Sequence, residues 1–505
     1  MRKAIRSIVD YSGVGGALIN VECHITNGLP AVVIIGYASK AVDEARERLR
    51  ASFSNCALNF PKKRITINLS PADIPKDSTS LDLAMAVAIL AQSGQIDNTD
   101  LNDTIFLGEI SLDGALNAVR GIVGRILVAK KMGFSKFYLP KANLEQALLI
   151  PDIAVKATDN LKTVYLDLSG ISPLKSMSSG KGRLIKAAQN LEVIDFAEIS
   201  GQPIAKRALE IAAAGHHNIL LYGPPGTGKT MLAKALCGIL PALTHEEILE
   251  VTHLHSLGGN EHDQIVSTRP FRSPHHTTST IALVGGGPNP KPGEASLAHR
   301  GVLFLDELPE FSHSSLEALR QPLEDGSITI ARIRDSATYP AEFILVATQN
   351  PCPCGYWGTP KPCSCTAAAI ARYQKRVSGP ILDRIDLHLS VQGVNHSQLL
   401  DSRNRQSETI PIKKRVENAY ATQRKRFKKS KFNGSMSNKE IRELARLSPQ
   451  AKQLLDTASA KLGLSARAYV RVVKVSRTIA DLGNELEILP QHIGEALQYR
   501  QQTAV

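Results

Sequence analysis

Hydrophobic runs alternate with helical patterns along the first third of the chain. The runs that predict strands are rich in β-branched residues and lie at 31–35, 64–69, 105–107 and 137–139. The patterns that predict helices lie at 40–50, 80–90 and 123–132. The first helical pattern is amphipathic, whereas the second is almost entirely apolar and predicts a buried helix. This alternation predicts an α+β domain, to which we assign residues 1–168.

A second alternation follows after residue 190. Apolar runs at 218–222, 302–305 and 342–347 predict buried strands, and residues 231–240 predict a helix. Capping residues mark further helix starts at Ser437, Ser448, Ser465 and Pro490. We therefore expect an α/β multidomain chain with a phosphate-binding core at 191–390 and a helical lid at 391–505. Residues 169–182 are rich in Ser, Gly and Lys, which predicts a linker over 169–190.

Length and composition limit the class of protein. A chain of 505 residues is too long for one core, and its 43% hydrophobic and 21% charged residues are typical of globular proteins. No apolar run reaches about 18 residues and no secretory signal follows the basic N-terminus, so we expect a cytoplasmic protein without membrane segments. The formal net charge of +13 favours a polyanionic partner such as nucleic acid, although charge that serves solubility alone is an equal alternative.

The clearest candidate chemistry lies in a glycine-rich turn between a predicted strand and a predicted helix. This turn consists of Gly223, Pro224, Pro225, Gly226, Thr227, Gly228, Lys229 and Thr230. Glycines let backbone N–H groups approach an anion closely, and the helix N-terminus adds partial positive charge. We expect Lys229 to reach the β- and γ-phosphates of a nucleotide and Thr230 to hold Mg²⁺. An ordinary turn before a helix is the alternative.

Two acids and an amide follow the next predicted strands. Asp306 and Glu307 end the apolar run at 302–305, and Asn350 comes soon after the run at 342–347. We expect Asp306 to hold Mg²⁺ and Glu307 to activate the attacking water, with Asn350 in contact with the γ-phosphate or that water. The alternative is a solvated acidic turn, which the preceding phosphate loop disfavours.

This order of parts resembles the AAA+ ATPases, which form rings with nucleotide bound between subunits. The resemblance implies that Asn350 is the sensor-1 residue and that Arg384 is the arginine finger, which enters the neighbouring subunit's site. Arg376 is a second candidate for the finger. The resemblance also implies that Arg467 is the sensor-2 residue, which contacts nucleotide phosphates. A salt bridge from Arg384 to a flanking aspartate remains the alternative to the finger role.

The first domain resembles the Lon-protease-type domain, which has a ribosomal-protein-S5-like fold. The residues that carry this resemblance are Pro75, Lys76, Asp77, Ser80, Gly108, Glu109, Gly114, Gly133 and residues 139–143. In the protease a lysine activates a serine. The resemblance places Ser80 on the serine position and Val123 on the lysine position, with Arg125 nearby. Because arginine stays protonated and cannot serve as a general base, we expect a non-proteolytic domain.

Four of the seven cysteines are clustered in two C-x-C pairs with eight residues between them. They are Cys352, Cys354, Cys363 and Cys365. Four thiolates at this spacing can close a tetrahedral Zn²⁺ site, and a closed site has no open position for catalysis. We therefore expect structural Zn²⁺ in a reducing compartment, with reduced free thiols as the alternative.

Two basic features are candidates for contact with nucleic acid. Residues 326–343 predict a hairpin that carries Arg332 and Arg334. Residues 413–432 interleave cations with aromatic residues, and the candidate contacts there are Lys425, Arg426, Lys428 and Lys429. A surface hairpin and a solvated helix face are the alternatives.

Taken together, the motifs resemble the magnesium-chelatase-like branch of AAA+ proteins, and within it the bacterial YifB/ComM family. The resemblance covers nearly the whole chain. It implies an ATP- and Mg²⁺-dependent homo-oligomer, with six subunits in the family. It also implies helicase and branch-migration activity on single-stranded or branched DNA during recombination and natural transformation, alongside recombination proteins. A protein-remodelling or chelatase-type motor, with the first domain as an adaptor, is the alternative.

Overall fold

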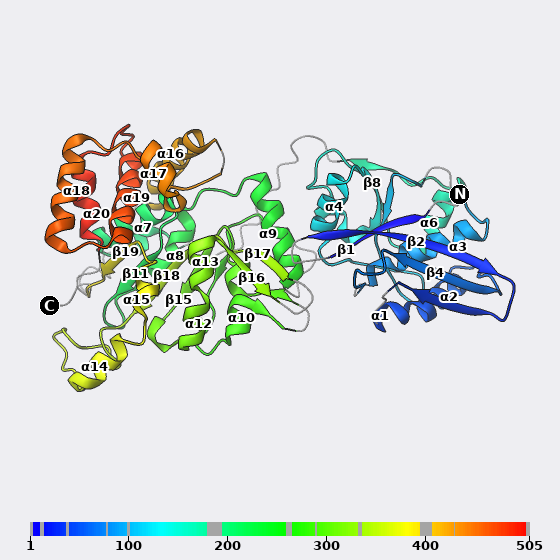
Figure 1. Cartoon of the computed structure of the whole chain (residues 1–505), viewed down its shortest axis with the longest axis horizontal. Coiled ribbons are helices and arrows are strands. Elements are labelled where there is room, and N and C mark those ends of the chain that lie inside the picture. The colour runs from blue at the N-terminus through cyan, green and yellow to red at the C-terminus, as the bar shows by residue number, and fades with distance from the viewer. Residues whose placement is uncertain are drawn as a thin grey trace. The chain divides into compact units, whose positions relative to one another are not determined.

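The computed structural model describes residues 4–10, 15–36, 40–76, 79–97, 101–178, 194–258, 265–287, 290–331, 336–393, 407–428 and 430–500. The chain forms two compact units (Figure 1). The first comprises residues 1–187, 244–267 and 329–339, and the second comprises residues 188–243, 268–328 and 340–505. Among the described residues, no helix is both long enough and apolar enough to cross a membrane.

The first unit is built on a mixed sheet of eight strands. Their order across the sheet is β10 (Met177–Ser178), β9 (Ala154–Thr158), β8 (Lys136–Pro140), β5 (Thr104–Phe106), β1 (Ile5–Asp10), β2 (Gly16–Thr26), β4 (Arg64–Ser70) and β3 (Ala31–Ile35). β1, β5, β8 and β9 run parallel to one another, whereas β2 is antiparallel to both β1 and β4. The predicted strands at 31–35, 64–69 and 137–139 are confirmed as β3, β4 and β8.

Both faces of this sheet carry a hydrophobic core, because alternate side chains of a strand point to opposite faces. On one face, Phe106 and Tyr138 join the core around α3 (Asp82–Gln92), in which nine of eleven residues are buried. On the other face, Ile105 and Phe137 join the core around α4 (Ile122–Lys131). A segment from later in the chain, α9 (His245–Gly258), packs on α4 and adds Leu249 to this second core.

The second unit contains a parallel sheet of five strands. Their order is β12 (Phe271–Arg272), β15 (Val302–Leu305), β18 (Ile344–Gln349), β11 (Ile219–Tyr222) and β19 (Leu387–Ser390). The strands β15, β18, β11 and β19 all point the same way, so their carboxyl ends share one edge. α7 (Pro203–Gly215) and α8 (Lys229–Ile239) share a core with these strands. An α/β sheet of this kind binds ligands at its carboxyl edge.

Helices make up the C-terminal part of the second unit, coloured orange to red in Figure 1. They are α16 (Thr409–Phe427), α17 (Asn438–Leu444), α18 (Pro449–Leu462), α19 (Ala466–Leu482) and α20 (Pro490–Gln498). Ser437, Ser448 and Ser465 cap α17, α18 and α19 with their side chains, as the sequence predicts. The chain is therefore a mixed α/β multidomain protein with a parallel sheet and a helical C-terminus.

Three local features differ from the sequence-based expectation. The helix expected at 40–50 is two helices, α1 (Lys40–Asp43) and α2 (Ala45–Asn55). The helix expected from residue 231 begins at Lys229, directly in the glycine-rich turn. Residues 169–178 were expected in a linker, but Met177 and Ser178 pair with β9 and extend the first unit's sheet. The remainder of that expected linker, to residue 190, lies outside the described residues.

Candidate active site and metal centre

The glycine-rich turn connects β11 to α8 at the carboxyl edge of the parallel sheet. Gly226 and Gly228 have φ angles of +79° and +84°, which side chains disfavour and which the turn requires. Gly223 packs against the backbone of Val391, where an added Cβ would lie 2.3 Å from the carbonyl oxygen. The Gly223 N–H donates to the Gln349 carbonyl at 3.0 Å, so the end of β18 holds the start of the turn.

Lys229 lies inside this turn with 8% of its surface exposed. Its Nζ donates to the carbonyl oxygens of Gly223 and Pro224 at 2.7 and 2.8 Å, and to Asn350 Oδ1 at 3.1 Å. Burial lowers the pKa of the Lys229 ammonium group, and the negative charges of Asp306 and Glu307 oppose that shift. The lysine is thus positioned by three neutral oxygen atoms at the place where a phosphate would bind.

The two acids lie beyond the end of β15, and the Thr348 hydroxyl connects them. Thr348 Oγ1 donates to Asp306 Oδ1 at 2.5 Å and accepts from the Glu307 N–H at 2.9 Å. Glu307 has a φ of +53°, a conformation that costs about 1–3 kcal/mol and is found mainly at functional sites. Asn350 Nδ2 reaches Glu307 Oε1 at 3.4 Å, so the structure brings together Lys229, Asn350 and both acids.

Two of the predicted arginines act on one carboxylate elsewhere in the second unit. Arg384 pairs with Glu324, a residue at the end of α13 (Arg320–Asp325), and donates to the Pro380 carbonyl at 2.8 Å. The hydrogen bond from Arg384 lowers the pKa of the Glu324 carboxyl, and the positive charge of Arg467 adds to that effect. Arg467 is exposed in the first turn of α19. Arg467 is therefore close enough to Glu324 for its charge to act on the carboxylate that Arg384 binds.

The other arginine contacts were not foreseen from the sequence. The sequence leaves a flanking aspartate as the alternative partner of Arg384. In the structure Arg384 pairs with Glu324, while Asp386 accepts from His217 and pairs with Arg471. Arg376, the second finger candidate, is half exposed and pairs with Glu310 at 2.7 Å.

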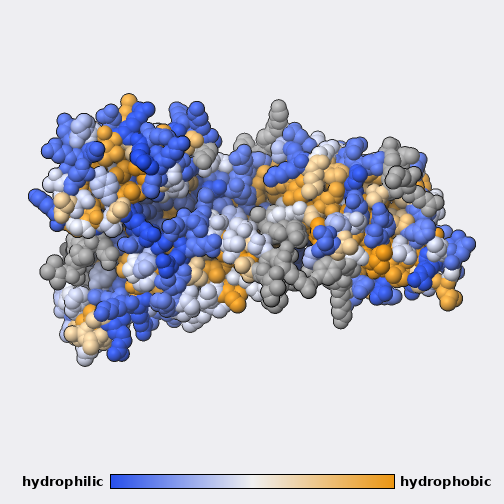
Figure 2. All heavy atoms as spheres, viewed as in Figure 1, coloured by the Kyte–Doolittle hydropathy of each residue, from blue (hydrophilic) through white to orange (hydrophobic). Residues whose placement is uncertain are grey.

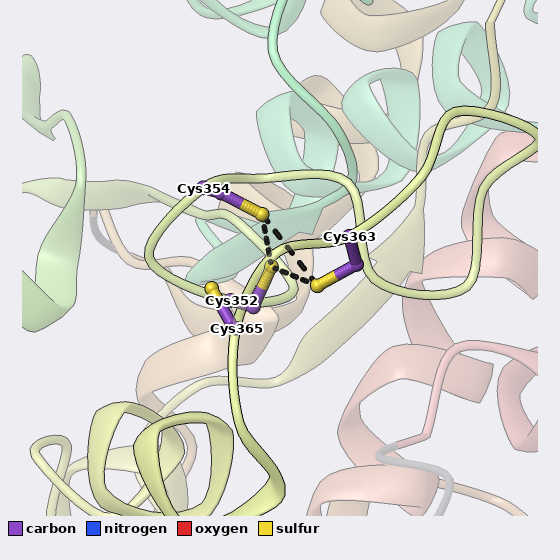
Figure 3. Close-up of side chains that lie close together, drawn as sticks. All are labelled: Cys352, Cys354, Cys363 and Cys365. Carbon is purple, nitrogen blue, oxygen red and sulfur yellow. Dashed lines mark hydrogen bonds between the residues drawn. The ribbon is translucent and has the colours of Figure 1, made fainter.

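The four cysteine sulfur atoms converge, as Figure 3 shows. Cys352 Sγ lies 3.4 Å from that of Cys354 and 3.7 Å from that of Cys363, and all four sulfurs lie within 4.8 Å of one another. Zinc–thiolate bonds of about 2.3 Å in a tetrahedron place sulfur atoms about 3.8 Å apart, so the cluster fits this ion. Backbone N–H groups of Tyr356 and Ser364 lower the pKa of Cys354 to about 6, which favours its thiolate. The pKa values of Cys363 and Cys365 are instead raised, because the backbone hydrogen bonds that would lower them are outweighed by burial and by hydrogen bonds with Cys354 and Cys352.

The basic segment divides into an outward and an inward part. Lys425 and Lys428 are exposed at the end of α16. Figure 2 shows that the surface of the second unit is mostly hydrophilic, with scattered hydrophobic patches, on the face drawn. Arg426 instead turns inward, because it pairs with the buried Asp481 at 2.5 Å and donates to Asn433 at 2.9 Å. We therefore withdraw Arg426 as a contact for nucleic acid. Lys429, like Arg332 and Arg334 of the hairpin, lies outside the described residues.

In the first unit, Ser80 and Arg125 are in direct contact. Arg125 Nη1 donates to Ser80 Oγ, and Nη2 pairs with Asp10 at 2.6 Å. Both Ser80 and Arg125 are almost fully buried. The residue that reaches the serine is therefore Arg125, two positions along α4 from Val123, where our resemblance placed the lysine position.

Sequence reasoning missed two residues of the second unit. Thr348 had no assigned role, although its position two residues before Asn350 placed it at the same strand end. Glu324 gave no signal, because it lies 60 residues from Arg384 in an ordinary helix end. Both act through contacts that depend on the folded chain.

Family models match almost the whole chain in three consecutive segments. Residues 21–143 match the model described as subunit ChlI of Mg-chelatase, and residues 195–399 match magnesium chelatase, subunit ChlI. Residues 406–500 match the C-terminal model of the same subunit. The segment at 195–399 contains the phosphate loop, both acids and the cysteine cluster.

Individual relatives extend this similarity. The chain is 43% identical to the competence protein ComM of Haemophilus influenzae over 97% of this chain and 95% of that protein. It is 42% identical to the uncharacterized protein YifB of Salmonella typhimurium, again over 97% of this chain and 95% of that protein. It is also 29% identical to the magnesium-chelatase 67 kDa subunit of Chlorobaculum parvum, over 32% of this chain and 24% of that protein.

Proposed function

This chain belongs to the ComM/YifB family of magnesium-chelatase-like AAA+ proteins, and from that premise we propose that it is an ATP-driven ring motor that moves branched DNA. The observation that carries the proposal is the meeting of Lys229, Asn350, Asp306 and Glu307 at one edge of a parallel sheet. A lysine in a glycine-rich turn, with two acids and an amide at the neighbouring strand ends, suits the hydrolysis of a nucleoside triphosphate.

The roles within the site follow from the positions of the side chains. Backbone N–H groups of residues 226–230 cradle the phosphates, because Pro224 and Pro225 have no N–H and the Gly223 N–H is already bound to the Gln349 carbonyl. Lys229 exchanges its carbonyl partners for phosphate oxygens. Thr230 and Asp306 would hold Mg²⁺, and the bound ion would supply positive charge against the phosphates. Glu307 accepts a proton from the attacking water, and Thr348 keeps the backbone of Glu307 and the carboxylate of Asp306 in register.

A neighbouring subunit completes the site. Arg384 enters the site of the next subunit in a ring, which we propose has six members, and Arg376 is the second candidate for this role. Because the charges of Arg467 and Arg384 both act on Glu324, we propose that both arginines face the same nucleotide. Charge from such arginines stabilises the transition state, so hydrolysis depends on assembly.

DNA is the proposed substrate that the ring moves. The net charge of +13 and the exposed Lys425 and Lys428 support a polyanion, and one relative is named a competence protein. We propose activity on recombination intermediates in the cytoplasm, with helicase and branch migration as the reaction that ATP drives.

The deciding experiment measures ATP-dependent unwinding of a forked DNA by the full chain. We expect unwinding and DNA-stimulated phosphate release from the wild type, and neither from Lys229→Ala or Glu307→Gln. Replacing Lys425 and Lys428 by Ala should weaken DNA binding, whereas the same charge change at the exposed Lys452 and Lys461 of α18 should not. ATP hydrolysis without unwinding or DNA stimulation would favour a motor that remodels a protein, as the likeness to a chelatase subunit allows.

A further inference from the structure

We infer that Gly355 is a positioning residue for the nucleotide, because its missing side chain lets the cysteine cluster support the phosphate loop at Pro225. The inference rests on the proposed ATP site. It predicts that metal on the four cysteines sets the affinity for nucleotide, although none of the cysteines contacts it.

The contact is close and depends on glycine. Gly355 follows Cys354 directly, has a φ of +84°, and donates its N–H to the Cys352 carbonyl at 2.9 Å. A Cβ added to Gly355 would lie 2.6 Å from Cδ and 3.0 Å from Cγ of Pro225. Real Cβ atoms essentially never approach so closely, and the proline ring cannot rotate away as a flexible side chain can. Any larger residue at position 355 must therefore displace Pro225 of the phosphate loop, or the segment that carries residue 355 must move away from Pro225.

The same segment of chain holds the phosphate loop at two further points. The Gln349 carbonyl accepts from the Gly223 N–H at 3.0 Å, and Asn350 Oδ1 accepts from Lys229 Nζ at 3.1 Å. Cys352 follows Asn350 after one residue, Pro351. Residues 349–355 thus contact the start, the tip and the lysine of the loop, so a shift of the cluster is transmitted to all three.

Zinc would give this segment its rigidity. A closed site with four thiolates fixes the positions of Cys352 and Cys354, and hence of Gly355 between the two C-x-C pairs. Loss of the ion would leave the four thiols with weak hydrogen bonds to one another and to backbone N–H groups such as that of Trp357. We therefore expect nucleotide affinity to fall when the ion is removed, before any general unfolding.

The loop itself provides a matched control. Gly358 lies three residues later with a similar φ of +75°, but a Cβ added there would meet no heavy atom within 4 Å. Gly355→Ala and Gly358→Ala therefore both place alanine at a positive φ, and only the first collides with Pro225 of the phosphate loop. Trp357 is the sole tryptophan of the chain. Its backbone N–H donates to Cys352 Sγ at 3.3 Å, so its fluorescence should report on the cysteine cluster.

The experiment measures the affinity of the full chain for a fluorescent ATP analogue, with zinc content and thermal midpoint determined on the same samples. We expect Gly355→Ala to weaken binding by about tenfold while zinc content and midpoint match those of Gly358→Ala. Gly358→Ala should bind within about twofold of the wild type. Zinc removal from the wild type should change Trp357 fluorescence and weaken binding by a similar factor.

A double variant tests whether the collision is the cause. Pro225→Ala removes the two ring carbons that an added Cβ would meet, so Gly355→Ala should cost little in that background. This comparison still decides the matter if Gly355→Ala alone loses zinc. Equal affinities of Gly355→Ala and Gly358→Ala would overturn the inference, as would unchanged affinity after zinc removal. A wild type that binds no ATP would instead overturn the proposed function.

Discussion

The two units each contain a cation beside a group that could do chemistry, but the cations have different partners. In the first unit Arg125 contacts Ser80 and is neutralised by Asp10, to which it donates at 2.6 and 3.1 Å. In the second unit Lys229 is held by the oxygen atoms of two carbonyls and an amide. A carboxylate is hydrogen-bonded directly to the first cation. Neutral oxygens are hydrogen-bonded to the second, and the charges of Asp306 and Glu307 act on it from nearby.

The comparison shows why a motif alone does not define a site. Ser80 lies where a nucleophile would lie, yet the group beside it stays protonated and is held by an ion pair. Asp306 and Glu307 are exposed, and Glu307 is kept in a disfavoured backbone conformation. The residues around Lys229 are therefore the ones that we propose to be active.

The largest expected effect comes from a substitution among the residues around Lys229 in the second unit, and the matched substitution at Ser80 in the first unit should have little effect. Glu307→Gln should lower the rate of ATP hydrolysis by about 10²–10⁴-fold, because the amide cannot accept the proton from water. Ser80→Ala should leave the rate within about twofold. Phosphate release at saturating ATP measures both variants. Equal losses in the two would mean that the first unit takes part in hydrolysis.

Arg384 is intermediate between Arg125 and Lys229, because it pairs with a carboxylate, Glu324, that is half exposed. Its pairing with Glu324 resembles that of Arg125 with Asp10, but Glu324 lies at the surface, where a neighbouring subunit's nucleotide could replace it. Arg384→Ala should lower hydrolysis by about 10²–10³-fold without weakening nucleotide binding to the same chain.

Mixed assemblies provide the control for Arg384. Combining Arg384→Ala with Lys229→Ala chains should restore hydrolysis, because some sites then receive an intact lysine from one chain and an intact arginine from the next. Failure of mixing to restore any hydrolysis would place Arg384 in its own subunit's site. The same test with Arg376→Ala decides between the two finger candidates.

A smaller effect concerns Ser80, Arg125 and Asp10 of the first unit. Arg125→Met should lower the free energy of unfolding of that unit by about 1.5–3 kcal/mol, because it removes hydrogen bonds to a charged group. ATP hydrolysis should persist at temperatures below the unfolding transition. Denaturant unfolding followed by hydrogen exchange of the first unit measures the loss. Labelling of wild-type Ser80 by a serine-directed fluorophosphonate would contradict the view that this cluster is inert.

A further expected effect is an opposite response of the two units to pH. Burial raises the pKa of Asp82 in the first unit to about 6, although Arg48 donates to it. Since an unfolded Asp has a pKa of about 3.9, this group costs the first unit stability as pH rises from about 4 to 6. Burial lowers the pKa of His388 in the second unit to about 4, so that unit loses stability as pH falls below about 6.5.

Amide hydrogen exchange resolved by peptide can follow each unit separately between pH 4 and 7. Asp82→Asn should flatten the response of the first unit only, and His388→Gln that of the second unit only. A variant that changed the other unit's profile would contradict the assignment.

The sequence predicted those features that depend on neighbours along the chain. The turn at 223–230, the acids after a strand and the cysteine spacing are local patterns, and the structure forms each as a local unit. The sequence did not predict contacts between positions that are far apart along the chain. Arg426 and Asp481 are 55 residues apart, and nothing in a run of cations shows which one turns inward. Likewise, Arg125 rather than Val123 reaches Ser80 because of the direction of α4, which no ungapped comparison specifies.

The path of the chain through the first unit has a consequence for synthesis on the ribosome. Domains generally fold as they emerge, N-terminal part first. Here one core of the first unit is completed by Leu249 of α9, and another small cluster joins Leu254 to Ala337 and Tyr339. A nascent chain that has reached residue 187 therefore still exposes apolar surface on α4, which it must keep from aggregating until α9 has been translated. The first unit can finish folding only after residues 244–267 and 329–339 have left the ribosome, and both segments follow the phosphate loop in the chain.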